Sequence, residues 1–424
     1  MEFKSNANIA EIFVNHFKKI YIGTENPSII IDNLEWRPIS LTTSLYKVNA
    51  KILADRLKIT LHNTIAESQL AFVKGRQITD VILMANEIVD YWKMRKIRGF
   101  VPKLDIKKTF DIISWDFIDF MLTKKNYPKK WRKWIEASIR SVQYSILING
   151  KPYDRINPNR GIRQGDPISP FIFILAMDYL SSLLNLLQEE KATKGVEINR
   201  QSLTNHILFA DDILLFTEDN DTSIKNLLMA ITLFEKASGL NINDTKSTLT
   251  PINVTKERTN NFTSIWNIPC HPFPINYLGV SLGGKPLIKG FWKHIIEKIH
   301  KKLNSWKYQH ISKGGNLTLL KGYLTSLPTY QLSVFKAPIS IYKEIEKHWR
   351  NFMWRSNKEP STTHLIKWTD ISRPKSKEGL GITSKNDTNF TLLCKWLWCF
   401  QTEPHALWRK VLTAKFEALK ENPY

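Results

Sequence analysis

Residues 208–216 read LFADDILLF, a segment in which two adjacent carboxylates, Asp211 and Asp212, interrupt an otherwise apolar run. The apolar runs HILFA and ILLFT lie on either side of the pair, which is typical of two antiparallel strands joined by a tight turn. A buried carboxylate without a partner is costly, and two adjacent carboxylates also repel each other. The segment therefore predicts a β-hairpin whose tip either meets a cation or is an ordinary polar turn.

Helical and extended patterns surround this hairpin in mixed order, which indicates an α+β fold. Helices are predicted for residues 42–65, 78–95, 171–187 and 222–239, the last of them ending at Gly239, and strands for residues 101–106 and 145–150. In the first helix, we expect the buried face to contain Leu45, Val48, Ile52, Ala54 and Leu57. The apolar segment 171–187 contains Asp178 and is short for a membrane span, so we expect a buried helix and no membrane partner.

Positive charge is concentrated in the last third of the chain. The net charge is +22; from Gly284 onward 25 Lys and Arg residues stand against 10 Asp and Glu residues, a net of +15. This asymmetry predicts a nucleic-acid partner, and a solvated basic face is the alternative. A helix is expected here with an apolar face and with lysines mostly elsewhere, the face being formed by Phe291, Ile295, Ile299, Leu303 and Trp306.

The three cysteines argue against a disulfide framework. Together with the lack of a secretory signal at the start of the sequence, they predict an intracellular, reducing compartment, with nucleus and cytoplasm both open. Cys394 and Cys399 lack the paired spacing of a zinc site, so core packing is the favoured interpretation.

Other segments favour a metal site at the hairpin. Asp105 ends a predicted strand in KLDIKKTFD, Gln164 lies in the Gly- and Pro-punctuated segment RGIRQGDPISP, and Lys246 ends SGLNINDTK soon after the hairpin. One carboxylate from a strand and a pair from a neighbouring hairpin can hold two Mg²⁺ ions, or Mn²⁺ in their place, for phosphoryl transfer.

Taken together and in order, these segments resemble the reverse transcriptase of LINE-type, non-LTR retrotransposons, most of all the plant elements. The resemblance runs from Trp36 to about Trp408. It is carried by WRPISLTTSLYKVNAKILADRL, ESQLAFVKGRQITDVILMANEI, KLDIKKTFDIISWDFI, NRGIRQGDPISPFIFILAMD, FADD, SGLNINDTKS, YLGVSLGG and IKWTDISRPKSKEGLGI.

The resemblance implies roles for individual residues. Asp105, Asp211 and Asp212 resemble the metal-binding triad. Phe110 resembles the aromatic gate that favours deoxynucleotides, and Arg37 resembles the fingers arginine that meets the incoming triphosphate. Gln164 and Gly165 resemble the residues against the template and the new base pair, and Lys246 resembles a lysine near the pyrophosphate. A core role for Phe110 and a plain surface role for Lys246 stay open, and Asp111 and Asp116 are interpreted as structural.

The resemblance departs at the front of the chain. The family carries a long fingers region with a Lys-Ala-Pro-Gly-Pro-Asp-Gly signature and a later Ile-Pro-Lys run, and neither occurs here. Residues 12–31 resemble the segment before that region, and DNLEWRPISL follows almost at once. We interpret this as an internal deletion. Because neither an endonuclease nor a ribonuclease H pattern is found, we expect a fragment of an element's polyprotein.

The resemblance implies a right-hand polymerase: a palm with an antiparallel sheet, truncated fingers and a helical, basic thumb. The predicted division is 1–34, a remnant of the segment before the fingers; 35–283, fingers and palm; and 284–424, thumb and C-terminal region. The implied activity is RNA-directed DNA polymerisation on an RNA template and a DNA primer, with deoxynucleoside triphosphates as substrates. The alternatives are a catalytically defective remnant that only binds nucleic acid, and a metal-dependent nuclease, which needs the carboxylates but not the gate.

Overall fold

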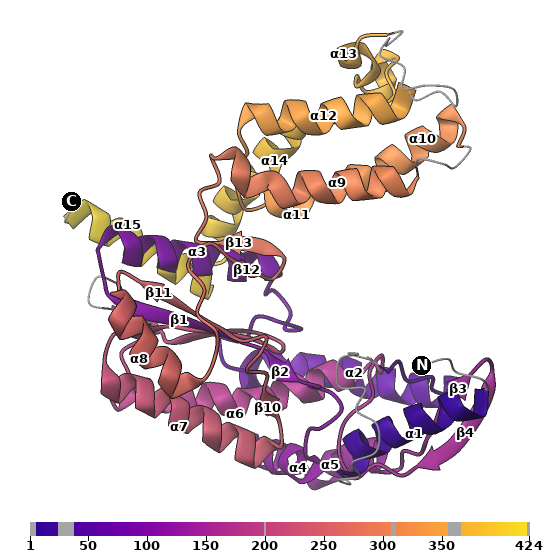
Figure 1. Ribbon diagram of the computed structural model, residues 1–424, viewed down its shortest axis with the longest axis vertical. Helices are drawn as coiled ribbons and strands as arrows, with labels where there is room; N and C mark the ends of the chain where they lie inside the picture. The colour runs from indigo at the N-terminus through magenta and orange to yellow at the C-terminus, as the bar shows by residue number, and fades with distance from the viewer. Residues whose placement is uncertain (1–5, 24–37, 199–200, 307–310, 355–365, 422–424) are drawn as a thin grey trace. The chain divides into compact units, whose positions relative to one another are not determined.

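The computed structural model describes residues 6–23, 38–198, 201–306, 311–354 and 366–421 (Figure 1). By their internal contacts these residues form two compact units. Unit 1 contains residues 1–78, 91–272 and 417–424, and unit 2 contains residues 79–90 and 273–416. The three-part division predicted from the sequence stays a prediction.

The centre of unit 1 is an antiparallel sheet in the order β11-β1-β8-β7, with β9 pairing with β1 beside β8. The strands are β1 (Gly99–Leu104), β7 (His206–Phe209), β8 (Asp212–Leu215), β9 (Thr217–Glu218) and β11 (Thr248–Ile252). The predicted hairpin is confirmed as β7–β8, in which Phe209 pairs with Asp212. Strand β1, predicted from VPKLDI, is buried except for half-buried Lys103, as expected for a strand covered on both faces.

Helices back this sheet and share one apolar core with it (Figure 1). They are α2 (Ser44–Thr64), α4 (Trp115–Lys124), α5 (Lys129–Arg140), α6 (Ser169–Glu189), α7 (Asp221–Ser238) and α8 (Lys256–Trp266). Helix α7 ends at Gly239 as predicted, since its φ of +73° is an angle that glycine adopts without strain. Among the described helices only α6 is long and apolar enough to cross a membrane, and its burial among α2, α4 and α7 is the core role predicted for it.

Smaller elements complete unit 1. Helix α1 (Asn6–Ile22) packs on the hairpin of β3 (Tyr144–Ile148) and β4 (Lys151–Ile156), which confirms the strand and glycine turn predicted from SILING. Strand β2 (Ile106–Lys107) pairs with β10 (Asn241–Ile242), and β5 (Val196–Ile198) pairs with β6 (Gln201–Thr204). The β2–β10 pair brings the chain after β1 next to the segment that follows α7.

The buried face predicted for residues 42–65 is wrong in part, although the helix itself is confirmed as α2. Its buried residues are Ala50, Leu53, Ala54, Leu57 and Leu61. Leu45, Val48 and Ile52 are instead 75%, 56% and 48% exposed. The alanines allow a close approach to α6, so packing against that helix selects a face that the larger apolar side chains alone do not reveal.

A buried ion pair explains the carboxylate inside the apolar helix α6. Asp178 is 2% exposed, and its carboxylate accepts a hydrogen bond of 2.7 Å from the backbone N–H of Ala66. The ammonium of Lys125 pairs with the other carboxylate oxygen and donates to the carbonyl of Thr64 at 2.6 Å. This pair therefore fixes the end of α2, and the loop after it, against α4 and α6.

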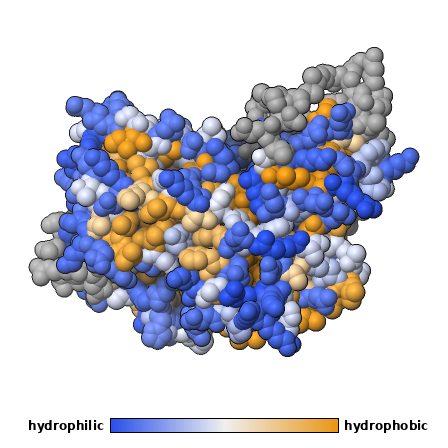
Figure 2. Space-filling view, turned by 90° about the horizontal axis from the view of Figure 1, so that it is seen from below, coloured by the Kyte–Doolittle hydropathy of each residue, from blue (hydrophilic) through white to orange (hydrophobic). Residues whose placement is uncertain are grey.

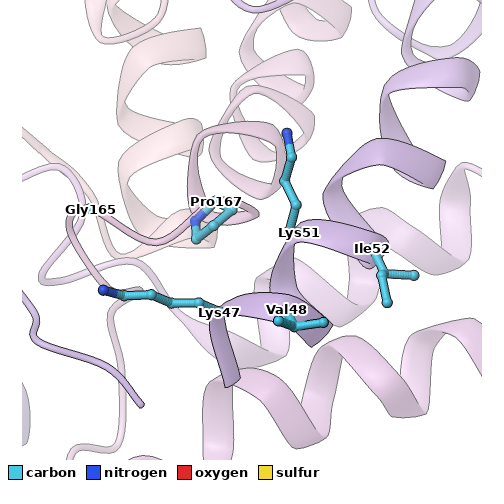
Figure 3. Close-up of a pocket in the computed structure, with 6 residues that line it drawn as sticks. All are labelled: Lys47, Val48, Lys51, Ile52, Gly165 and Pro167. Atoms are coloured by element: carbon cyan, nitrogen blue, oxygen red, sulfur yellow. The ribbon is translucent and has the colours of Figure 1, made fainter. Parts of the chain in front are cut away.

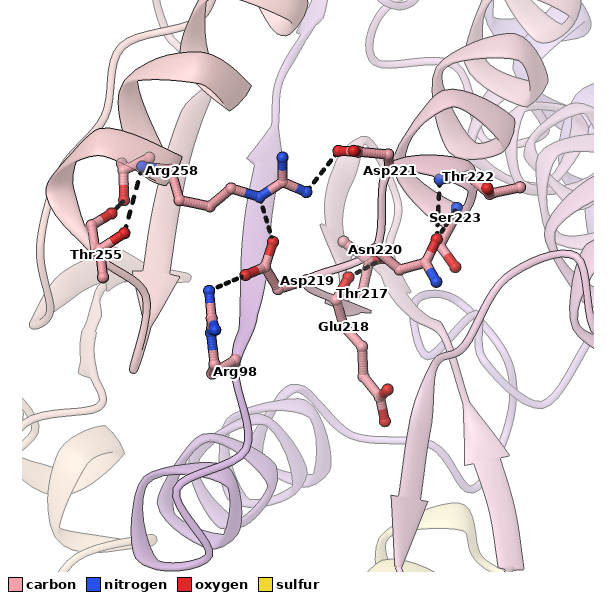
Figure 4. A network of polar contacts seen from close by, with 11 residues as sticks. Arg98, Thr217, Glu218, Asp219, Asn220, Asp221, Thr222, Ser223, Thr255 and Arg258 are labelled. Atoms are coloured by element: carbon pink, nitrogen blue, oxygen red, sulfur yellow. Dashed lines mark hydrogen bonds and ion pairs between the residues drawn. The ribbon is translucent and has the colours of Figure 1, made fainter.

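A second polar network closes the start of α7 (Figure 4). The carboxylate of Asp219 lies 2.7 Å from the guanidinium of Arg98, just before β1, and 2.6 Å from that of Arg258 in α8. Arg258 also pairs with Asp221 at 2.5 Å, and the Asn220 side chain caps α7. Because Asp219 is 6% exposed and faces two arginines, this junction is a structural tie rather than a free anion site.

Unit 2 is mainly helical. It contains most of α3 (Ile78–Met94), the hairpin of β12 (Ile275–Tyr277) and β13 (Val280–Leu282), and the main helices α9 (Lys293–Ser305), α10 (Lys313–Leu319), α12 (Ile339–Trp354) and α14 (Lys385–Thr402), with most of α15 (Leu407–Glu421). Its shorter helices are η1 (Lys289–Trp292), η2 (Leu320–Leu324), α11 (Thr329–Leu332), α13 (Trp368–Ile371) and η3 (Lys375–Lys377). On the apolar face predicted for residues 291–306, Leu303 is half-buried and the other four residues are buried.

Two buried polar side chains attach α14 to the rest of unit 2. The amide of Asn389 accepts from the Ala337 N–H and the Tyr342 hydroxyl, and donates to the backbone carbonyl of Phe335 after α11. Lys385 donates to the carbonyl of Thr325 at 3.0 Å and lies 5.0 Å from the centroid of the Trp349 ring. Burial lowers the pKa of the Lys385 ammonium to about 8. Because the side chain is buried and makes these two contacts, its role here is packing and capping.

Candidate active site

Strand pairing brings the three predicted aspartates together at one end of the sheet. In the β1–β8 ladder Lys103 pairs with Leu214 and Leu104 with Ile213. Extending this register by one residue sets Asp105 opposite Asp212, with Asp211 in the turn beside it. The strand-end position of Asp105 and the hairpin-tip position of the pair are therefore placed as the sequence predicts.

The three carboxylates lie close enough together to affect one another's pKa. Burial raises the pKa of Asp105; the nearby Lys246 opposes this rise, while Asp211 adds to it. Burial, then repulsion from Asp211 and Asp105, raises the pKa of Asp212 to about 6. The hydroxyl of Thr109 lies 3.4 Å from the Asp211 carboxylate. The three carboxylates thus form one cluster of like charge, in which each charge disfavours the others.

Carboxylate oxygens are the ligands that Mg²⁺ prefers, so the donor chemistry of this cluster fits a hard cation. Within the part of the chain that the structure describes, however, no group of three or more His, Cys, Asp or Glu side chains has an arrangement ready to hold a metal ion. The metal-binding role of Asp105, Asp211 and Asp212 therefore stays a prediction, although the backbone brings them to one place.

The segment after α7 holds Asp105 in position. The backbone N–H of Asn243 donates to the Asp105 carbonyl at 2.7 Å, and its side-chain amide donates to the carboxylate at 3.3 Å. The Asp105 N–H donates to the hydroxyl of Ser247 at 3.1 Å. Sequence reasoning singled out only Lys246 in this segment. Asn243 and Ser247 flank it in SGLNINDTKS, and their contacts depend on the β2–β10 pairing.

A buried glutamine, Gln69, holds the hairpin turn that presents Asp211. The side-chain oxygen of Gln69 accepts from the N–H groups of Ala210 at 3.0 Å and Ala71 at 3.1 Å, and its amide lies 3.5 Å from the Ala210 carbonyl. Ala210 has a φ of +55°, a conformation that is strained for alanine. Gln69 is fully buried, so these bonds hold the strained turn that presents Asp211.

The residues predicted to lie against nucleotide and template come from two segments bonded to each other. The N–H of Ile162 donates to the carbonyl of Phe110 at 2.6 Å. The amide of Gln164 lies 3.4 Å from the carboxylate of Asp111, a buried residue that also accepts from Tyr21. Gly165 is exposed with a φ of +85°. Asp111 therefore has the predicted structural role, and Asp116 has its own in the first turn of α4.

Comparison with known proteins decides what this arrangement belongs to. The reverse transcriptase (RNA-dependent DNA polymerase) family matches residues 27–282, which is more than half of the chain. The chain is a member of the reverse transcriptase family. The antiparallel sheet backed by helices is accordingly the palm of a right-hand polymerase, as the resemblance implied.

Retrotransposon proteins are among the relatives of this chain. It is 30% identical over 224 residues to a Pol polyprotein of retrotransposable element R2 from Popillia japonica, covering 53% of this chain and 30% of the relative. It is 23% identical over 335 residues to a transposon TX1 protein from Xenopus laevis, covering 75% and 24%. A protein from Arabidopsis thaliana described as a putative ribonuclease H is 32% identical over 132 residues, covering 31% and 21%. The chain thus spans less than a third of the length of each relative.

Solved structures give a more distant likeness. The telomerase of Candida tropicalis in complex with a fragment of telomeric RNA is 12% identical to this chain, with a TM-score of 0.42 and with 97% of this chain and 59% of that one covered. A score this low carries no argument beyond the family match. The relatives support the non-LTR retrotransposon assignment, while the plant-like character and the deletion in the fingers stay predictions.

An open hollow of about 440 Å³ lies beside Gly165 (Figure 3). Lys47, Val48, Lys51 and Ile52 line it from α2, and Pro167 lines it from the segment that follows Gly165. The side chain of Lys47 extends towards Gly165 in this view. Val48 and Ile52, which the sequence analysis placed on the buried face of the helix, therefore line a surface hollow together with two lysines.

Three predicted site residues remain: Arg37, Lys246 and Phe110. Arg37 lies outside the described residues. Lys246 is exposed and lies near enough to Asp105 to oppose the rise that burial causes in its pKa. Phe110 is half-buried, and its ring centroid lies 5.3 Å from that of Phe173. One side of Phe110 therefore packs in the core, and its gate role stays a prediction.

Gln69 gives a testable prediction about this site. The Gln69→Leu variant keeps the approximate volume but removes the bonds to the turn, so we expect primer extension to fall by about 10- to 100-fold, since small displacements of reacting groups cost up to about that much. The loss should lie in kcat rather than in KM for primer–template. Gln143→Leu, at an exposed position, is the matched control. An unchanged rate per folded Gln69→Leu molecule would contradict this role.

Proposed function

We propose that this chain carries the RNA-directed DNA polymerase domain of a retrotransposon and extends a DNA primer on an RNA template. The supporting observation is the convergence of Asp105, Asp211 and Asp212 at one end of the palm sheet. In the reaction, the primer 3′-hydroxyl oxygen forms a bond to the α-phosphorus of a deoxynucleoside triphosphate. The bond from the α-phosphorus to the oxygen that bridges to the β-phosphate breaks, pyrophosphate leaves with the electron pair, and the hydroxyl proton passes to solvent.

The chain's own residues supply position and charge for this reaction. The three aspartates would hold two Mg²⁺ ions, or Mn²⁺, which activate the attacking oxygen and stabilise the leaving one when bound. Burial and then repulsion from the neighbouring aspartates raise the pKa of Asp212, and a divalent cation would offset that repulsion. Lys246, beside Asp105, is suited to the charge of the pyrophosphate. Phe110 and Gln164, from two bonded segments, are suited to the sugar and the template base.

Primer extension tests the proposal. A 5′-labelled DNA primer annealed to an RNA template is incubated with the purified chain, deoxynucleoside triphosphates and Mg²⁺. We expect stepwise extension that a chelator abolishes and that ribonucleotides do not support. If no extension occurs with Mg²⁺ or Mn²⁺ while the chain still binds the primer–template, the polymerase proposal fails.

The second candidate function is a remnant that binds nucleic acid without polymerising it. It is favoured by the exposed apolar residues Leu45, Val48 and Ile52 on α2, the helix that the resemblance assigns to the fingers, because a missing fingers segment would leave such a face uncovered. The same assay separates the two candidates.

We also propose an intracellular, reducing location, which the three free cysteines support.

A further inference from the structure

Helix α5 presents a basic and aromatic face that lies outside the candidate active site. Its buried residues, Ile135 and Ile139, face the core of unit 1. Lys129, Lys130 and Lys133 are exposed and, at spacings of three and four residues, lie on the opposite side. The sequence PKKWRK thus places three cations on one outward surface.

Ion pairs around this face neutralise the arginines and leave the lysines available. Arg132 forms two bonds, of 2.9 and 3.0 Å, with Asp119, and Arg140 lies 2.5 Å from Asp116 and 3.1 Å from Glu136. The exposed lysines at 124, 129, 130 and 133 form no ion pair with any residue that the structure describes. The arginines and acids of α4 and α5 therefore largely cancel, and the remaining surface charge comes from these lysines.

Aromatic rings lie among these cations. Trp134 is 40% exposed, with the ammonium of Lys130 at 5.4 Å from its ring centroid, and Phe120 is 43% exposed, with that of Lys124 at 5.7 Å. Figure 2 views the molecule from below Figure 1, where α4 and α5 lie, and shows a mostly hydrophilic face with hydrophobic groups among it. Exposed rings beside unpaired cations are the elements of a surface that stacks bases and binds phosphates.

We propose that the outward face of α5 binds single-stranded nucleic acid, with Lys129, Lys130 and Lys133 on the phosphates and Trp134 against a base. An anionic membrane is the weaker fit, because the aliphatic residues of α5, Ile135 and Ile139, face inward and Trp134 is the one exposed ring of that helix. The inference deepens the proposed function by adding a strand contact that uses no residue of the candidate active site. It does not require that the chain polymerise.

Fluorescence anisotropy with a labelled single-stranded RNA tests this surface at several salt concentrations. The variant K129Q/K130Q/K133Q is compared with K225Q/K236Q/K256Q, which removes the same charge from exposed positions on α7 and α8. We expect the first variant to bind roughly tenfold more weakly at low salt and its salt dependence to fall by about two in slope, since each lost phosphate contact removes about 0.7 for a single strand. The second variant should change both much less.

Trp134→Ala separates stacking from charge. It should weaken single-stranded binding by about tenfold, the order expected for one stacked base, and affect duplex binding little. Equal loss in the two triple variants, or a loss in the first that appears only with phosphatidylserine vesicles, would overturn the proposal. Because binding is measured without chemistry, a chain that fails to polymerise can still confirm the α5 surface, and an active chain can still contradict it.

Discussion

Replacing Asp211 with alanine is expected to reduce primer extension on RNA by about 10³-fold or more, with no loss of folding stability. One positioned electrostatic group at a reaction centre commonly contributes ~10²–10³ in rate, and this carboxylate would hold metal ions as well. Asp211 lies in the turn between β7 and β8, where it contributes no side chain to the core. Its charge also raises the pKa of Asp212, so removing it relieves repulsion in the folded protein.

This combination of results distinguishes a catalytic carboxylate from a structural one. Thermal unfolding of Asp211→Ala should match or slightly exceed the wild-type midpoint, and RNA binding by anisotropy should stay unchanged. Asp244→Ala is the matched control, because Asp244 is an exposed carboxylate in the segment that holds Asp105. Comparable activity in wild type and Asp211→Ala would remove Asp211 from the site, and an equal loss in Asp244→Ala would show that only general charge matters.

Sequence patterns predict this site well where they report local geometry. Two apolar runs around two aspartates leave almost no choice but a hairpin, and a glycine after an amphipathic run marks the end of α7. Asp105 could be placed at a strand end because it follows a short apolar run. Residues whose contacts span long stretches of chain were not predicted: Gln69 lies 141 positions from the turn that it holds, and Asn243 lies 138 positions from Asp105.

The partly wrong prediction for α2 has a related cause. Hydrophobic periodicity ranks Leu45, Val48 and Ile52 as core residues, but the neighbour of a helix decides which face is buried. Packing against α6 buries a face that includes Ala50 and Ala54; Leu45 is left exposed, and Val48 and Ile52 line the hollow at Gly165. A single sequence gives the period of a helix more reliably than the direction in which it packs.

Replacing Asp178 with alanine is expected to lower the free energy of unfolding by about 3 kcal/mol. Breaking a buried ion pair by removing one partner typically costs ~3–5 kcal/mol, because the other charge is left unpaired. The lower end applies here, since the Lys125 side chain is 23% exposed and water screens part of its charge. The backbone N–H of Ala66 also loses its acceptor. A loss of this size is a large fraction of the stability of an ordinary domain.

Urea unfolding of a set of variants tests whether the ion pair itself, rather than the loss of side-chain volume, causes the destabilisation. Asp119→Ala, which breaks the more exposed pair with Arg132, should cost less than about 1 kcal/mol. The double variant Asp178→Leu with Lys125→Met should recover much of the loss, because an apolar pair of similar volume can replace a buried ion pair at little cost. Since Ala66 begins the loop that carries Gln69, Asp178→Ala should also loosen the hairpin tip, which hydrogen exchange at the Ala210 N–H would detect. If the single variant unfolds at the wild-type urea concentration, or the double variant is no more stable than the single one, then the Lys125–Asp178 pair does not hold α2 to α6.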